Sequence, residues 1–330
     1  MKSMVRVFLL LCLVAAVAAC QSMGGAYGTG KFFPRLNLKV GDVFVAHESI
    51  RLHTTVPMGN MPGMEVKNEQ NIEMDTQIEV TKRLPNNTWR LTYTITRFRN
   101  EMSSMGMYQS YDSAVDDNEA NPLGVMVGHQ FLMTLDEECK IVDFSGLDEL
   151  FDKIIERVGP IQQAERQALT QKLRETLNED SIKQNMLPNS GMYPDEPVTI
   201  GESWSKDYDL RAIVPMSGVG RYTLSKRENG RAYIDVLIDF TQNPNGQPLN
   251  LNGLLLDFDE GVSAGTLILD EENGMVVGSQ TITDMTMSMN VPPEQAALGG
   301  IPDNLTMRIH MEHNYTLTDA DQAETVYPVK

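Results

Sequence analysis

Hydrophobic and polar residues alternate strictly along several stretches of the chain. In residues 72–80 every second residue is apolar or small, and acidic or amide residues lie between them. The same period of two runs through residues 89–95 and through residues 305–317. This period places successive side chains on opposite faces of a strand. The pattern therefore predicts strands with one buried and one solvated face, which favours antiparallel pairing.

One central segment has helical spacing instead. Its apolar residues recur three and four positions apart: Leu147, Leu150, Phe151, Ile154, Ile155 and Val158. Gly159-Pro160 interrupts the stripe, which resumes at Ile161 and continues to about residue 178. A loop that follows Pro188 ends the segment. We therefore expect an insert of two amphipathic helices between two strand-rich regions.

The two strand-rich regions resemble each other in three segments that occur in the same order. Residues 40–44 (VGDVF) match residues 200–204 (IGESW), and residues 81–87 with Trp89 match residues 224–230 with Tyr233. Residues 135–142 (LDEECKIV) match residues 269–276 (LDEENGMV). These matches predict an internal duplication of several strands. Convergent hairpin chemistry is the alternative, because acidic residues and turn formers are common wherever strands reverse.

The first twenty residues have the architecture of a bacterial secretory signal. Lys2 and Arg6 precede an apolar run at residues 7–17, which is shorter than the ~20 residues of a spanning helix. The run leads into Val17-Ala18-Ala19-Cys20, which resembles the lipobox of bacterial lipoproteins. The resemblance implies cleavage before Cys20, acylation of its thiol and, because Gln21 is not Asp, delivery to the outer membrane. The alternatives are an uncleaved membrane anchor and a plain secreted protein.

Net charge restricts the possible binding partners, and the cysteine content restricts the possible disulfides. The formal net charge of −18 makes binding to nucleic acid or flat adsorption to an anionic membrane unfavourable. Removal of the signal leaves Cys139 as the only thiol besides the lipidated Cys20, so no disulfide is expected within the mature chain.

The order of these elements resembles a family of uncharacterised bacterial envelope lipoproteins. The resemblance rests on four features. They are a hydrophobic-Gly-acidic sequence at the start of the first strand-rich region, a hairpin that begins with Leu-Asp, the helical insert, and residues 197–204 (PVTIGESW) at the start of the second strand-rich region. It covers about residues 36–318 and implies location and fold only. The architecture is more distantly similar to periplasmic half-barrels that carry lipids or lipoproteins.

We therefore predict a mainly β fold of curved antiparallel sheets, with two duplicated half-barrel units and a two-helix insert. The expected segments are a signal peptide (1–19), a lipidated flexible tether (20–35), an N-terminal β unit (36–146), the helical insert (147–190), a C-terminal β unit (191–320) and a tail (321–330).

Two motifs that suggest an enzyme lack the structural context that the chemistry needs. Residues 261–265 (GVSAG) spell a nucleophile elbow, but the strand-like residues 266–269 follow where a helix is required. Residues 25–32 approach a phosphate-binding loop, but Phe32 replaces the magnesium-binding hydroxyl and no strand precedes the loop. No catalytic residue is predicted, and we expect a protein that is not an enzyme.

Metal-binding motifs are also incomplete. His310 and His313 are expected on opposite faces of one strand, where a single ion does not easily reach both. The acidic groups at residues 136–138, 257–260 and 270–272 lack the spacing of a calcium loop, so they are interpreted as solvated turns. No metal ligand or cofactor is predicted from these residues.

Methionine is the compositional exception, with 21 residues in the chain. Three groups stand out: Met58, Met61 and Met64 in a loop rich in Pro and Gly; Met102, Met105 and Met107; and Met285, Met287 and Met289 at strand spacing. Ordinary packing, an adaptable apolar binding surface and Cu(I) coordination by thioethers are the three interpretations. Met58, Met61 and Met64 are the predicted ligand-binding residues, because a loop of this kind can cap an apolar cavity.

These observations lead to three functional hypotheses. The first is a lipoprotein anchored in the outer membrane through Cys20 that binds an apolar ligand or a lipidated envelope partner without catalysis. The second is a structural or assembly module of the cell envelope, and the third is a methionine-rich copper-binding protein.

Overall fold

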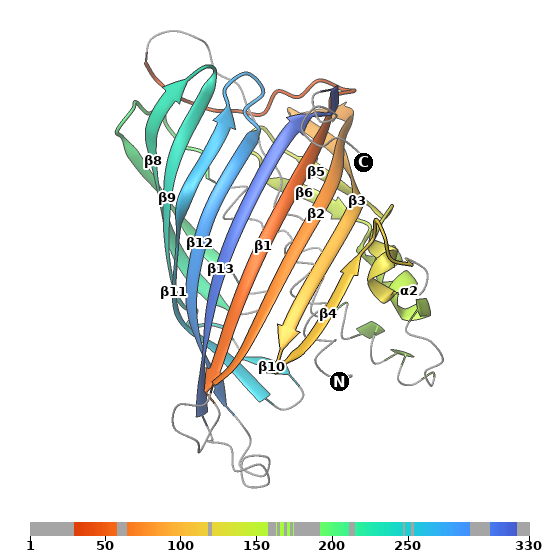
Figure 1. Ribbon diagram of the computed structural model, residues 1–330. Coiled ribbons are helices and arrows are strands. Elements are labelled where there is room, and N and C mark those ends of the chain that lie inside the picture. Colours follow the sequence, from red (N-terminus) through yellow and green to blue (C-terminus); the bar gives the residue numbers. More distant parts are fainter. Residues whose placement is uncertain are drawn as a thin grey trace.

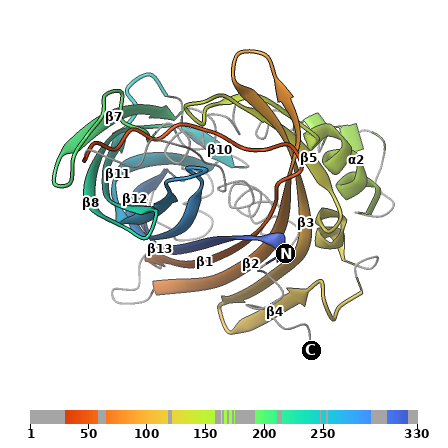
Figure 2. The ribbon, with the colours of Figure 1, turned by 90° about the horizontal axis from the view of Figure 1, so that it is seen from above.

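The computed structural model describes residues 30–57, 65–117, 121–157, 192–210, 215–246, 248–251, 254–290 and 304–321, with isolated positions between 163 and 174. Within these residues the fold is mainly β, as predicted. A single antiparallel sheet of 13 strands curves around an interior and does not close on itself (Figures 1 and 2).

The sheet has two halves, and each half is formed by strands that are consecutive in the sequence. The first half contains β1 (Val43–Pro57), β2 (Glu65–Leu84), β3 (Thr88–Ser104), β4 (Met107–Asp112), β5 (Gln130–Leu135) and β6 (Ile141–Ser145). The second half contains β7 (Ser203–Leu210), β8 (Met216–Glu228), β9 (Arg231–Gln242), β10 (Leu249–Leu251), β11 (Leu254–Asp270), β12 (Val276–Asn290) and β13 (Asn304–Asp319). The order across the sheet is β6-β5-β3-β2-β1-β13-β12-β11-β9-β8-β7, with β4 paired to β3 and β10 to β11.

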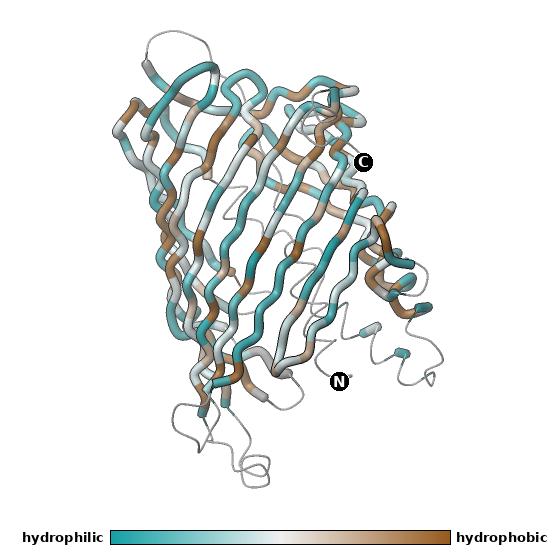
Figure 3. The backbone as a smooth tube through the Cα atoms, in the orientation of Figure 1, coloured by the Kyte–Doolittle hydropathy of each residue, from teal (hydrophilic) through white to brown (hydrophobic). Residues whose placement is uncertain are grey.

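Hydrophobic and hydrophilic residues alternate along the strands (Figure 3), and the burial of the side chains assigns the two sets to the two faces of the sheet. Ile72, Met74, Thr76, Ile78 and Val80 of β2 are buried on the concave face, and the residues that alternate with them are exposed or half-buried. On β3, Trp89, Leu91, Tyr93 and Ile95 are buried in the same way. These inward side chains form one hydrophobic core inside the curved sheet.

The three matched segments occupy equivalent places in the two halves. In the first, Gly41 N donates to Val80 O and Val80 N donates to Asp42 O, both at 2.9 Å. In the second, Gly201 N donates to Leu224 O at 2.7 Å, and Leu224 N donates to Glu202 O at 3.1 Å. The β2–β3 and β8–β9 pairs also shift register at the same point, after Val80 and after Leu224. The sequence matches therefore correspond to repeated backbone structure.

The two halves are joined by β13. This strand pairs with β1 on one side and with β12 on the other, so that the halves form one continuous sheet. Short turns link β2 to β3, β5 to β6, β8 to β9 and β11 to β12 at one end, which is the upper end in Figure 1. The strands β1 and β12 finish at the other, lower end, at Pro57 and Asn290.

The first predicted helix is present as α2 (Leu147–Arg157). Its buried side consists of the predicted stripe Leu147, Leu150, Phe151, Ile154 and Ile155, and α2 packs beside the 3-10 turn η1 (Pro122–Met126). Most of the second predicted helix lies outside the described residues. Arg174, one of its described positions, lies 2.8 Å from Asp148 of α2.

The segment before β1 differs from the prediction. Residues 32–35 were placed in the flexible tether, but Phe32 is only 3% exposed and forms an isolated bridge with Val198. Leu36 and Leu38 are also buried, and Leu38 O accepts a hydrogen bond from Trp89 Nε1 at 3.0 Å. Alternating apolar residues at 32, 36 and 38 therefore attach this segment to the body.

Candidate functional site

A band of polar side chains crosses the otherwise apolar concave face. Each member forms a hydrogen bond with a residue on a neighbouring strand, which satisfies its polar atoms inside the protein. The pairs are Ser263–Thr283 at 2.9 Å, Glu48–His313 at 2.8 Å, Gln70–Asn100 at 3.1 Å, and Asn68–Ser104. We call these eight residues the polar band.

Glu48 and His313 are the ionisable members of the polar band. Their side chains are 5% and 13% exposed, and Glu48 Oε1 lies 2.8 Å from His313 Nε2. Glu48 occupies an inward position of β1, between the buried apolar residues Ala46 and Ile50. A charged residue at an inward position is a sequence signal that the alternation analysis overlooked, since burial of a carboxylate requires a partner.

Tyr315 lies directly opposite Glu48 in the pairing of β1 with β13. Burial raises the pKa of Tyr315 well above its usual value, so the hydroxyl stays protonated. Among the described residues, no hydrogen-bond partner is present for this hydroxyl. A buried unpaired hydroxyl is costly.

Beside the polar band and below its upper members, β12 and β13 carry a continuous apolar surface on their concave face. It consists of Met285, Met287 and Met289 on β12, and of Met307, Ile309 and Met311 on β13. We call these six residues the methionine surface. Met285 pairs with Ile309 and Met287 pairs with Met307, so the side chains of the two strands lie side by side.

The methionine surface is not sealed within the core. Met287 is 5% exposed, whereas the other five side chains are half-buried and pack against the core from its margin. The facing part of the concave wall, on β2 and β3, carries Asn68, Gln70 and Ser104 instead. The lower part of the concave face is therefore apolar on one side and polar on the other.

Met285, Met287 and Met289 share the concave face, as their strand spacing predicts; Met287 is buried in the core, and Met285 and Met289 are half-buried at its margin. The group at Met102, Met105 and Met107 is different: Met102 is half-buried, but Met105 and Met107 are 65% and 53% exposed at the β3–β4 turn. Met105 also has a positive φ of 51°, as the tight turn requires. Packing does not explain these two side chains.

The predicted binding residues Met58, Met61 and Met64 and the predicted lipidation site Cys20 lie outside the described residues. The flanking residues of the methionine loop are described, because β1 ends at Pro57 and β2 begins at its partner Glu65. Two residues before Pro57, Thr55 pairs with Arg308, the neighbour of Met307. The loop therefore leaves the sheet at the end where the methionine surface lies.

The nucleophile-elbow motif is part of a strand, as expected. Ser263 lies in the middle of β11 and pairs with Ile238 and Thr283 on the adjacent strands. Gly265 packs so closely on β12 that an added Cβ would lie 2.0 Å from Gln280 O. The glycine thus has a packing role, and the strained strand-to-helix turn that the chemistry needs is absent from this segment.

His310 and His313 lie on opposite faces of β13, as predicted. His313 points inward to Glu48, whereas His310 Nδ1 lies 2.8 Å from Asp284 Oδ1 on the outer face. The part of the chain that the structure describes contains no group of three or more His, Cys, Asp or Glu residues placed to hold a metal ion. It also contains no helix with the length and apolar character needed to cross a bilayer.

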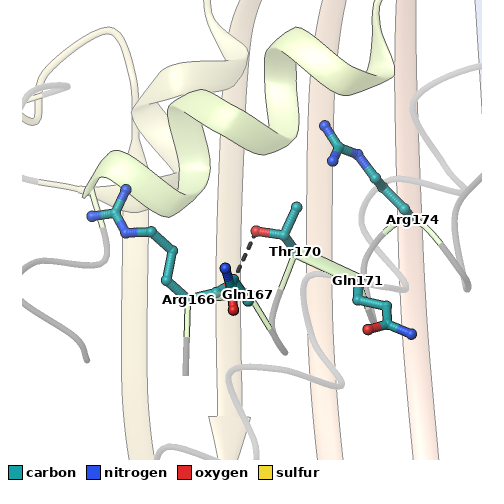
Figure 4. Close-up of a pocket in the computed structure, with 5 residues that line it drawn as sticks. All are labelled: Arg166, Gln167, Thr170, Gln171 and Arg174. Carbon is teal, nitrogen blue, oxygen red and sulfur yellow. Dashed lines mark hydrogen bonds between the residues drawn. The ribbon is translucent and has the colours of Figure 1, made fainter. Parts of the chain in front are cut away.

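A separate open pocket of about 500 Å³ lies beside α2, lined by Arg166, Gln167, Thr170, Gln171 and Arg174 (Figure 4). Thr170 Oγ1 donates to Arg166 O at 2.9 Å. Arg174 is paired with Asp148 at 2.8 Å and Asp152 at 3.6 Å, so its charge is already compensated.

Comparison with solved structures gives distant likenesses. Lipovitellin, from a study of its lipid–protein interactions, is 9% identical with a TM-score of 0.42; the match covers 86% of this chain but only 26% of lipovitellin. The outer membrane protein OprG of Pseudomonas aeruginosa is 8% identical with a TM-score of 0.21, over 85% of this chain and 97% of OprG. An outer membrane channel of Pseudomonas putida F1 is 9% identical with a TM-score of 0.22, over 86% and 97% of the two chains.

These TM-scores are too low to establish a shared fold. No curated protein sequence matches the chain significantly. A family model does match, over residues 86–276, which is more than half of the chain and runs from the β2–β3 turn to the start of β12. The chain therefore belongs to DUF6263, a family of unknown function.

Proposed function

We propose that the protein is an outer-membrane lipoprotein that is anchored through Cys20 and binds an apolar molecule, or the acyl chain of a lipidated envelope partner, on its concave face. The half-buried methionine surface is the single observation that carries the proposal. Binding is by shape and apolar contact, without catalysis.

The chemistry of the methionine surface suits such a ligand. Methionine side chains are unbranched and polarizable, so they adapt to apolar molecules of different shape. Five of the six residues keep part of their apolar area accessible, and its removal from water stabilises a complex by about 25 cal/mol per Å². The adjoining polar band supplies hydrogen-bonding groups for a ligand with a polar end.

Binding can be tested with a dansyl-labelled undecanoic acid, whose fluorescence rises in an apolar site. Met285→Lys places a charge in the methionine surface and is expected to weaken binding at least tenfold, about 1.4 kcal/mol. Thr286→Lys places the same charge on the opposite face of β12 and serves as the matched control. Equal affinity of the wild-type protein and the Met285→Lys variant, with circular dichroism showing both folded, would refute the proposal.

The anchor is tested separately. The full chain expressed in a Gram-negative host is expected to stay in the membrane pellet after a carbonate wash, and its N-terminal peptide to carry acyl chains on Cys20. Cys20→Ala is expected to release the protein. An unmodified Cys20 in membrane-derived protein would rule out the anchor and leave the binding hypothesis in place.

A second candidate, an assembly module, is favoured by an apolar patch on the convex face. Val219, Leu237, Val262 and Ile282 are 51%, 36%, 38% and 45% exposed on β8, β9, β11 and β12, which are adjacent strands. Asp239 lies between Val219 and Val262 in the strand pairing, so the four side chains form a cluster of exposed apolar residues with a charged group among them; exposed apolar clusters are typical of interaction sites. If this cluster binds an envelope partner, the double variant Val262→Asp/Ile282→Asp will give a smaller protein complex in mild detergent than the wild-type protein gives. The Met285→Lys variant is expected to leave the size of that complex unchanged.

A further inference from the structure

His53 and His310 face each other across β1 and β13 on the convex side of the sheet. They are direct partners in the strand pairing, and their ring centroids are 6.1 Å apart. Their side chains are 47% and 40% exposed, so both rings are accessible to solvent and can rotate. Two imidazoles in this arrangement form a potential chelate.

Each ring has a carboxylate beside its Nδ1 atom. His310 Nδ1 lies 2.8 Å from Asp284 Oδ1, and His53 Nδ1 lies 3.8 Å from Glu69 Oε1. Histidines that bind metals usually donate their second ring N–H to a carboxylate, which orients the ring and increases the basicity of the coordinating nitrogen. The 2.8 Å contact occupies Nδ1 of His310 and leaves its Nε2 as the coordinating atom. Glu69, at 3.8 Å, is beyond hydrogen-bond distance but lies on the Nδ1 side of His53, which favours Nε2 there as well.

We propose that His53 and His310 chelate one divalent transition-metal ion through their Nε2 atoms, with Cu²⁺ preferred and water in the remaining positions. An ion 2.0–2.1 Å from an imidazole nitrogen lies about 3.2 Å from the ring centroid, so two rings on one ion have centroids no more than about 6.4 Å apart. The observed 6.1 Å lies within this limit. Divalent copper has the highest affinity for nitrogen ligands in the first transition series.

The charge around the pair also favours a cation. Glu312 Oε1 lies 3.8 Å from His310 Nε2, while the other oxygen of Glu312 pairs with Arg51 at 3.6 Å; the whole chain carries a formal charge of −18. Because the described residues offer no ready-made group of three side-chain ligands, the site is a two-histidine chelate open to solvent. This site is distinct from the methionine surface, which lies on the opposite face of the sheet, and it does not depend on the function proposed for that surface.

The test is a titration of the purified full chain in detergent with CuCl₂, followed by electron paramagnetic resonance and calorimetry. The wild-type protein is expected to bind one Cu²⁺ with a signal split by two nitrogen ligands. His53→Ala and His310→Ala are each expected to remove this signal and to weaken binding at least tenfold, and Asp284→Asn to weaken it about tenfold.

His47→Ala is the matched control, because His47 also lies on the convex face of β1 and pairs with Asp75 but has no histidine opposite it. Loss of the two-nitrogen signal in both alanine variants but not in His47→Ala supports the proposal. Persistence of the signal in both variants, or no uptake of Cu²⁺ by the wild-type protein, overturns it. If an alanine variant fails to fold by circular dichroism, the corresponding glutamine variant replaces it.

Discussion

Glu48 and His313 form a hydrogen-bonded pair in the interior although 265 positions separate them in the sequence. The pair connects β1 to β13, the contact through which the two halves of the sheet are joined. Its position on the concave face shows that the core combines apolar packing with a buried ionisable pair.

Removal of one partner of this pair is expected to destabilise the protein strongly. Glu48→Ala leaves His313 without its acceptor in a buried site, and we expect the free energy of unfolding in urea to fall by about 3 kcal/mol. Glu272→Ala is the control, because Glu272 and its partner Lys39 are 78% and 75% exposed at 3.9 Å; its effect is expected to stay below about 0.5 kcal/mol. Similar losses for the two variants would contradict this interpretation.

Tyr315→Phe is expected to leave the protein equally stable or up to about 1 kcal/mol more stable, because its buried hydroxyl has no partner in the described part of the chain. The comparison is Tyr208→Phe, which removes a hydrogen bond to Tyr222 between two buried residues and is expected to cost about 1 kcal/mol. Thermal unfolding of both variants measures the difference. A marked loss for Tyr315→Phe would show that the hydroxyl is hydrogen-bonded.

Gly265 is expected to tolerate no side chain. A Cβ at this position would lie 2.0 Å from Gln280 O and 2.7 Å from Thr281 Cα, both backbone atoms of β12. Gly265→Ala therefore has to separate β11 from β12, and we expect a loss of more than about 2 kcal/mol in urea unfolding. Gly278→Ala is the control on the adjacent strand, since its Cβ would come no closer than 3.4 Å to the Ile268 side chain. Equal stability of the two variants would refute the close-packing argument.

The pair His47–Asp75 is expected to make stability depend on pH. The hydrogen bond to Asp75 at 2.6 Å raises the pKa of His47 above its usual value of 6.5, although partial burial opposes the shift. Since the raised pKa belongs to the folded state, this stabilisation is fully present below pH 6.5 and is lost as pH rises through the folded-state pKa. Unfolding of wild-type and His47→Gln proteins between about pH 5 and pH 9 measures it. The stability difference between them should shrink towards high pH; a constant difference would contradict the prediction.

The local structure was largely predictable because period-two alternation determines which face of a strand is buried. Residues 72–80 and 305–317 show this, and so does Ser263, whose surrounding motif is a strand. The pairing of strands was not predictable in the same way. Alternation on β1 and β13 is compatible with many partners, and nothing in either strand indicates that β13 lies between β1 and β12.

In the candidate site, too, the face of each side chain was predictable and the pairing of the strands was not. The spacing of Met285, Met287 and Met289 predicted a common face, and the alternation in residues 305–317 placed Met307 and Met311 on one face of their own strand. Only the register of β12 with β13 brings these two sets together. The pairs Glu48–His313 and His53–His310 depend on the register of β1 with β13 and were missed for the same reason.

The central position of β13 has a consequence for biogenesis. Strand β13 separates two blocks of strands that precede it in the chain, so before it docks the two blocks present unpaired edges at β1 and β12. Loss of the C-terminal residues would split the sheet in the middle instead of shortening it at one side. Formation of the continuous sheet therefore depends on β13, whose pairs with β1 are far apart in the sequence and are expected to form slowly.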